Sequence, residues 1–185
     1  MTKTSNEKEV VQKILHGDTN AMKELYDMYI GRLNAICSRY ITDKETVRDV
    51  LQDSFIKIFE SISSFEYRGS GSLLAWTTRI VVNESIDKLK EQEHFEWIHS
   101  MKDVPDIPDD EMPEIESTPQ SAIMGMIQSL PTGYRTVFNL YVFENKSHKE
   151  IASLLHIKES TSASQLYRAK AILREEINRY NQSNT

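Results

Sequence analysis

The sequence feature that most constrains the fold is a stretch rich in proline and acidic residues at 92–119. It holds four of the five prolines of the chain: Pro105, Pro108, Pro113 and Pro119. Residues 91–119 also carry ten acidic side chains and one basic one. Proline interrupts helices and like charges repel each other, so this stretch buries too little apolar surface to offset the entropy lost on ordering. We therefore predict a flexible linker at 92–119, with one domain before it and one after it.

Apolar residues before the linker, in residues 1–91, recur every three or four positions, which is the spacing of one helix face. The pattern predicts four helices, over about 10–15, 21–40, 47–62 and 73–91. We expect the third helix to begin near Thr42 or Asp43, since both residue types cap helix N-termini well. Because no alternation of apolar and polar residues competes with this spacing, the first domain is expected to be all-α.

Helical spacing also predicts the structure after the linker, in residues 120–185. A short helix is expected at 121–129, and Pro131 marks the start of the next one. We expect that helix, at 134–143, to turn four side chains towards the core: Val137, Phe138, Tyr141 and Val142. The second domain is therefore predicted to be all-α as well.

The segment SHKEIASLLHIKESTSASQLYRAKAIL, residues 147–173, has the pattern of a helix-turn-helix. Ser147 and Glu150 form a predicted capping box, in which each side chain accepts a hydrogen bond from the other residue's amide. We expect a corner at His156 and Ile157 and a last helix that opens near Ser160. On that helix a polar stripe at i, i+3, i+4 and i+7 suits a DNA groove, or else the solvated face of an ordinary helix pair: Thr161, Ser164, Gln165 and Arg168.

The net charge of −6 is unusual for a DNA-binding chain, because affinity for DNA comes mostly from Lys and Arg. The negative charge is local, however: residues 1–90 sum to zero, 91–119 to −9, and 120–185 to +3. Cys37 is the only cysteine and the histidines lack ligand spacing, so we expect neither a disulfide nor a metal site. No apolar run approaches 18 residues, so we expect a cytoplasmic chain without membrane insertion.

Four segments resemble, in this order, regions 2 and 4 of extracytoplasmic-function sigma factors: ETVRDVLQDSFIKIFESISSF, GSLLAWTTRIVVNESIDKLK, LPTGYRTVFNLYVFENKSHKEIASLLHI and YRAKAILR. The resemblance implies two small helical domains, region 2 at 1–91 and region 4 at 120–185. It also implies a promoter-specificity subunit that binds bacterial core RNA polymerase and promoter DNA, without catalysis or a cofactor of its own. A monomeric free state and an anti-sigma partner are further expectations. The acidic linker at 92–119 would thread a polymerase channel and imitate nucleic acid, or else serve as a passive spacer.

The resemblance also assigns candidate site residues. The polymerase-binding set is Asp49, Gln52, Asp53 and Lys57. The set for recognition of the −10 promoter element is Phe65, Tyr67, Arg68, Ser72, Arg79, Asn83 and Lys88. The set for the −35 element is Thr161, Ser164, Gln165, Tyr167 and Arg168. Asn83, within RIVVNESID, is carried over most readily, whereas Trp76 is assigned to the core because apolar residues surround it in the sequence.

The last helix departs from the family pattern at three positions. An aliphatic residue is usual at Ser162, and basic residues are usual at Ala163 and often at Gln165. Recognition of the −35 element is therefore expected to be weak or directed at an unusual sequence.

Two other classes of function stay open at this point. A free-standing helix-turn-helix regulator would bind duplex DNA alone, usually as a dimer. A helical enzyme would use Asp49 and Asp53 as paired carboxylates, but no further ligand or nucleophile accompanies them.

Overall fold

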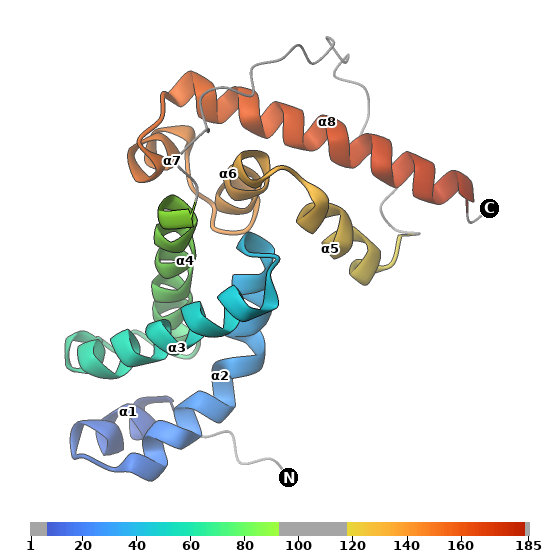
Figure 1. Cartoon of the computed structure of the whole chain (residues 1–185). Coiled ribbons are helices and arrows are strands. Elements are labelled where there is room, and N and C mark those ends of the chain that lie inside the picture. Colours follow the sequence, from blue (N-terminus) through green and yellow to red (C-terminus); the bar gives the residue numbers. More distant parts are fainter. Residues whose placement is uncertain (1–6, 93–117, 184–185) are drawn as a thin grey trace. The chain divides into compact units, whose positions relative to one another are not determined.

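A computed structural model of the chain describes residues 7–92 and 118–183. It divides into two compact units, Met1–Gln92 and Glu93–Thr185, which we describe separately. Every regular element within the described residues is a helix, so the predicted all-α fold class is confirmed (Figure 1). The predicted linker at 92–119 lies outside the described residues, apart from Gln92, Thr118 and Pro119.

The first unit consists of α1 (Glu7–Leu15), α2 (Thr19–Tyr40), α3 (Lys44–Ser61), the 3₁₀ turn η1 (Ile62–Ser64) and α4 (Ser72–Gln92). Helices α2, α3 and α4 each pack against the other two, and α1 packs against α2 (Figure 1).

Local signals set the helix starts in this unit. The Asp18 carboxylate caps α2 by accepting from the Asn20 amide at 2.9 Å. The Asp43 carboxylate caps α3 by accepting from the Thr46 amide at 2.8 Å, at one of the two predicted starts. Burial of a Leu, Ile or Val side chain contributes about 1.5–3 kcal/mol, so the core supplies most of the stability. Its fully buried members include Leu25, Leu33, Ile58, Leu73 and Val81.

The second unit consists of α5 (Gln120–Ser129), α6 (Thr132–Val142), α7 (His148–Leu155) and α8 (Glu159–Ser183). Helix α8 packs against the other three (Figure 1). The capping box is confirmed: the Ser147 amide donates to Glu150 Oε2 at 2.8 Å, and the Glu150 amide donates to Ser147 Oγ at 3.3 Å. The corner is confirmed as well, with His156 in the left-handed region at φ +55°.

The predicted core face of α6 is partly wrong. Val137 is fully buried, but Tyr141 and Val142 are 38% and 42% exposed. The buried face of α6 includes three polar residues, Arg135, Thr136 and Asn139. The Arg135 guanidinium donates to the backbone oxygens of Gln128 and Leu130, both at 2.9 Å, and so satisfies the end of α5. Hydrophobicity alone could not show this pairing.

The second unit also begins earlier than residue 120. Thr118 is buried, and its hydroxyl donates to Asn181 Oδ1 on α8 at 3.0 Å. The last two residues of the predicted linker therefore belong to the folded part, with Pro119 as the N-cap of α5.

Candidate functional site

The exposed face of α3 presents three of the four residues of the polymerase-binding set. Asp49, Gln52 and Asp53 are exposed, whereas the opposite side of the helix buries Val47 and Leu51 among others. Ile56 continues the exposed face at the i+7 position and is 47% exposed. The sequence analysis missed Ile56, although an apolar residue lying off the apolar stripe is a usable signal. The face therefore combines two carboxylates, an amide and one apolar side chain.

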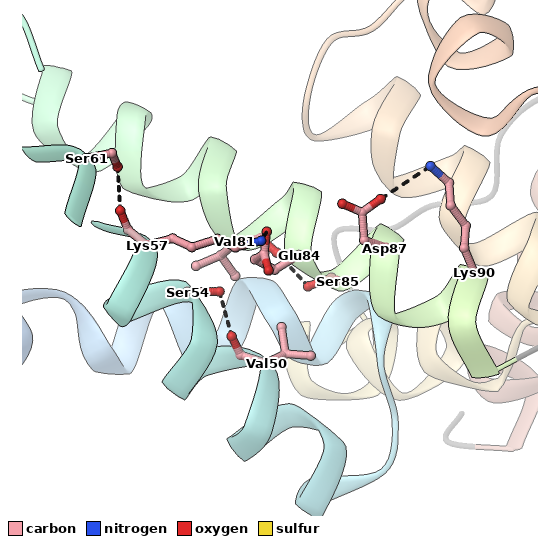
Figure 2. A network of polar contacts seen from close by, with 9 residues as sticks. All are labelled: Val50, Ser54, Lys57, Ser61, Val81, Glu84, Ser85, Asp87 and Lys90. Carbon is pink, nitrogen blue, oxygen red and sulfur yellow. Dashed lines mark hydrogen bonds and ion pairs between the residues drawn. The ribbon is translucent and has the colours of Figure 1, made fainter. Parts of the chain in front are cut away.

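Lys57, the fourth residue of that set, is bound to α4. Its Nζ lies 2.6 Å from Glu84 Oε1 (Figure 2). The hydrogen bond from Lys57 to Glu84 raises the pKa of Lys57, and the charges of Glu84, Asp87 and Asp53 act in the same direction. Lys57 thus joins α3 to α4, the helix that carries Asn83.

The loop between η1 and α4 and the first turns of α4 enclose an open hollow of about 600 Å³. It is lined by Ser64, Phe65, Glu66, Arg68, Ser72, Ala75, Trp76 and Arg79. Four residues of the −10 set, Phe65, Arg68, Ser72 and Arg79, therefore line one hollow. Tyr67 is exposed and does not line it. The assignment of Trp76 to the core is wrong: it is half-buried and its ring centroid lies 5.3 Å from that of Phe65.

Ser72, the first residue of α4, makes two hydrogen bonds to the loop beside the hollow. Its hydroxyl donates to the Gly69 oxygen at 2.6 Å and accepts from the Arg68 amide at 3.2 Å. Gly69 and Gly71 have φ values of +111° and +84°, which residues with a side chain rarely adopt. The backbone of this loop therefore depends on its two glycines.

Glu7 of α1 also makes a hydrogen bond to this loop. Its carboxylate accepts from the Gly71 amide at 3.1 Å and from the Tyr29 hydroxyl of α2 at 2.7 Å. Burial, followed by the hydrogen bond to Glu7, raises the pKa of Tyr29 well above its usual range. The sequence analysis missed Glu7, because no local pattern connects residues 64 positions apart.

Asn83 is exposed on α4 and lines a second hollow of about 400 Å³ together with Lys57, Glu60, Ser61, Ile80 and Glu84. Lys88 is not brought to Asn83: five residues further along a helix, its side chain points roughly 140° away. Its ammonium is bound to Glu91 at 3.5 Å. Asp87 and Lys90, which bind each other at 3.4 Å, continue the stripe of Asn83 instead (Figure 2).

The first turns of α8 present part of the −35 set. Ser164 and Tyr167 are exposed, and Thr161 is half-buried. Arg168 is also half-buried and donates to the Tyr134 hydroxyl at 3.2 Å. Gln165 is only 6% exposed, so the prediction that it belongs to an exposed polar stripe is wrong. The buried face of α8 is wide because this helix packs against three others.

The departure at Ser162 is matched by His148. Ser162 is fully buried, and its hydroxyl lies 3.0 Å from Nδ1 of His148, the first residue of α7. The His148 ring also stacks on Tyr141, with 4.8 Å between ring centroids. His148 therefore makes a hydrogen bond to Ser162 and a ring contact to Tyr141 at the position of this departure.

Within residues 7–92 and 118–183, no cluster of three or more His, Cys, Asp or Glu side chains is placed to hold a metal ion. No helix in those ranges is both long and apolar enough to cross a membrane. Burial raises the pKa of the Cys37 thiol.

Family models match both units. Residues 25–95 match the model described as "Sigma-70 region 2", and residues 120–173 match the one described as "Sigma-70, region 4". The chain belongs to the sigma-70 family. The RNA polymerase sigma-H factor of Pseudomonas aeruginosa is 27% identical to it, over 92% of this chain and 93% of that protein. The ECF RNA polymerase sigma factor SigW of Bacillus subtilis is 25% identical, over 92% and 96%.

The protein is thus an extracytoplasmic-function sigma factor, a promoter-specificity subunit that binds RNA polymerase and promoter DNA and directs transcription initiation. Its fold is also similar to the sigma factor RpoE of Bartonella quintana, solved in complex with the anti-sigma factor NepR. That chain is 18% identical, with a TM-score of 0.50, and the match covers 84% of this chain and 96% of that one.

Proposed function

We propose that the two units divide promoter recognition between them. The first binds core polymerase through the exposed face of α3 and recognises the −10 element through the 600 Å³ hollow and Asn83. The second recognises the −35 element through the first turns of α8. The observation that carries this proposal is the hollow, because it gathers four residues of the −10 set with an aromatic pair.

The hollow has the chemistry that a base removed from the duplex requires. Such a base loses its stacking and pairing, and stacking on an aromatic ring restores about 1–3 kcal/mol. Phe65 and Trp76 supply aromatic surface, while Arg68, Ser72 and Arg79 supply hydrogen-bonding groups at the rim. A base seated there would offset part of the cost of opening the promoter.

The face of α3 has the composition of a protein-binding surface. Interfaces commonly place an apolar anchor within a polar rim, and the anchor contributes most of the binding energy. Ile56 would be the anchor here, with Gln52 and Asp53 one turn before it on the same helix. We therefore propose a polymerase-binding face made of Asp49, Gln52, Asp53 and Ile56.

The second unit offers few contacts to DNA. Ser164 and Tyr167 are the exposed members of the −35 set, and Ala163 stands where a basic residue is usual. This composition supports weak binding of the free chain to duplex DNA, so core polymerase supplies much of the affinity. We further propose that the protein catalyses no reaction of its own and acts in the cytoplasm, where it joins the polymerase. The proposal also includes an anti-sigma partner, as in the RpoE structure.

Run-off transcription tests the proposal. Purified core polymerase and the full chain are incubated with fragmented genomic DNA, and the 5′ ends of the transcripts are mapped. We expect defined start sites that disappear without the chain, together with loss of polymerase binding in the variant Gln52→Ala, Asp53→Ala. Random start sites would refute the proposal, and tight symmetric binding of the chain alone to duplex DNA would favour the free-standing regulator.

A further inference from the structure

The ion pair between Lys57 and Glu84 lies beside Asn83, and on α3 it stands about 40° around the helix from Asp53. It crosses from α3 to α4 with 2.6 Å between Nζ and Oε1 (Figure 2). The Lys57 side chain is 55% exposed, whereas that of Glu84 is 15% exposed. Both line the 400 Å³ hollow with Asn83. The partly buried carboxylate therefore holds the ammonium group of a side chain that is otherwise largely open to solvent.

Carboxylates outnumber ammonium groups around this hollow. Of the described residues that line it, Lys57 is the one base, whereas Glu60 and Glu84 are both acidic. Asp53 and Asp87 lie close enough for their charges to act on Lys57. A phosphate that approaches Asn83 from the side of this hollow thus meets one ammonium group and two carboxylates among the described lining residues. A lysine increases DNA affinity only when its charge is available to displace counterions from phosphates.

From this geometry we infer that Glu84 withholds Lys57 from the DNA backbone and so limits sequence-independent attraction at the helix that carries Asn83. Lys57 then acts on the DNA side of the first unit and not in polymerase binding. Phosphate contacts strengthen binding to every sequence, whereas base contacts discriminate between sequences. Without a phosphate contact from Lys57, a larger share of the binding energy at α4 comes from base contacts, which distinguish one promoter sequence from another. This inference rests on the proposed role of α4 in recognition of the −10 element.

The variant Glu84→Gln tests the inference in the holoenzyme. It keeps the size of the side chain but removes its charge, so Lys57 becomes available to one phosphate. One additional contact steepens the dependence of log affinity on log salt by about 0.7–0.9. Between 200 and 50 mM salt, the affinity of Glu84→Gln relative to wild type should therefore rise by about 3-fold. The probe is a promoter fragment with a single-stranded −10 region, and binding is measured by fluorescence anisotropy.

Two further variants make the result specific. Adding Lys57→Met to Glu84→Gln should return the salt dependence to that of wild type. Asp27→Asn removes the same charge from the Lys23–Asp27 pair of α2, which has a separation of 2.8 Å, and should leave the salt dependence unchanged. If Asp27→Asn and Glu84→Gln behave alike, net charge explains the effect and the inference is wrong. An unchanged salt dependence in Glu84→Gln also overturns it.

Polymerase binding decides between the two roles of Lys57. We expect Lys57→Met to bind core polymerase as wild type does, and reduced binding would return Lys57 to the polymerase-binding set and overturn the inference. Failure of the proposed function is distinguishable, because wild-type holoenzyme would then show no preference for promoter over non-promoter fragments at any salt concentration.

Discussion

Replacing Glu7 with alanine should release the loop beside the 600 Å³ hollow from α1 and α2. The carboxylate accepts hydrogen bonds from two donors, the Tyr29 hydroxyl at 2.7 Å and the Gly71 amide, which reaches both oxygens at 3.1 and 3.2 Å. A hydrogen bond to a charged group contributes about 1.5–3 kcal/mol, and the lower end applies here because the Gly71 bond is exposed. We therefore expect Glu7→Ala to lower the unfolding free energy of the first unit by roughly 2–3 kcal/mol. Tyr29→Phe, which leaves the bond to Gly71, should lower it by about half as much.

The assay is urea unfolding of the full chain, followed by the fluorescence of Trp76. The chain has two tryptophans, so Trp97→Phe serves as the common background and leaves the indole that lines the hollow. Glu9→Ala is the matched control, since Glu9 pairs with Lys13 on the surface of the same helix and such pairs contribute about 0–1 kcal/mol. Equal unfolding free energies for Glu7→Ala and Glu9→Ala would refute the argument.

Three other predictions follow from the site and the helix caps. Asn83→Ala should lower promoter opening by the holoenzyme about tenfold, as loss of a base contact of about 1–3 kcal/mol implies, without changing polymerase binding. Permanganate footprinting measures promoter opening and a pull-down measures polymerase binding. Unchanged promoter opening would remove Asn83 from the site. Ser147→Ala should lower the unfolding free energy of the second unit by about 1 kcal/mol in thermal denaturation, and no loss would mean that the capping box contributes little. Because the pKa of Tyr29 is raised in the folded state, its hydrogen bond stabilises the chain fully below the unfolded pKa of about 10 and is lost as pH rises further. The unfolding free energy of wild type should therefore fall more steeply above pH 10 than that of Tyr29→Phe, and parallel curves would contradict this reasoning.

The sequence predicts the helices of this protein well because their signals are local. Apolar spacing defines one face, and a cap such as Asp43 or the Ser147–Glu150 box lies within three residues of the turn that it closes. The corner at His156 is predicted on the same basis. Positions of this kind depend on neighbours in the sequence, so tertiary structure changes them little.

The positions that the sequence misplaces depend on partners far away in the chain. Gln165 is polar and lies on a polar stripe, yet it is buried because α8 contacts three helices and needs a wide buried face. Glu7 and Lys57 have charged side chains typical of a solvated surface, but each is fixed by a residue on another element. Trp76 is half-buried, and its ring lies against that of Phe65 on the loop. Spacing along one helix contains no information about these partners.

The hydrogen bond between Thr118 and Asn181 brings the first and last described turns of the second unit to one point. Tension on the segment before Thr118 therefore reaches this unit at the far end of α8 as well as through α5. A fluorescent protein or affinity handle fused behind α8 would crowd that junction.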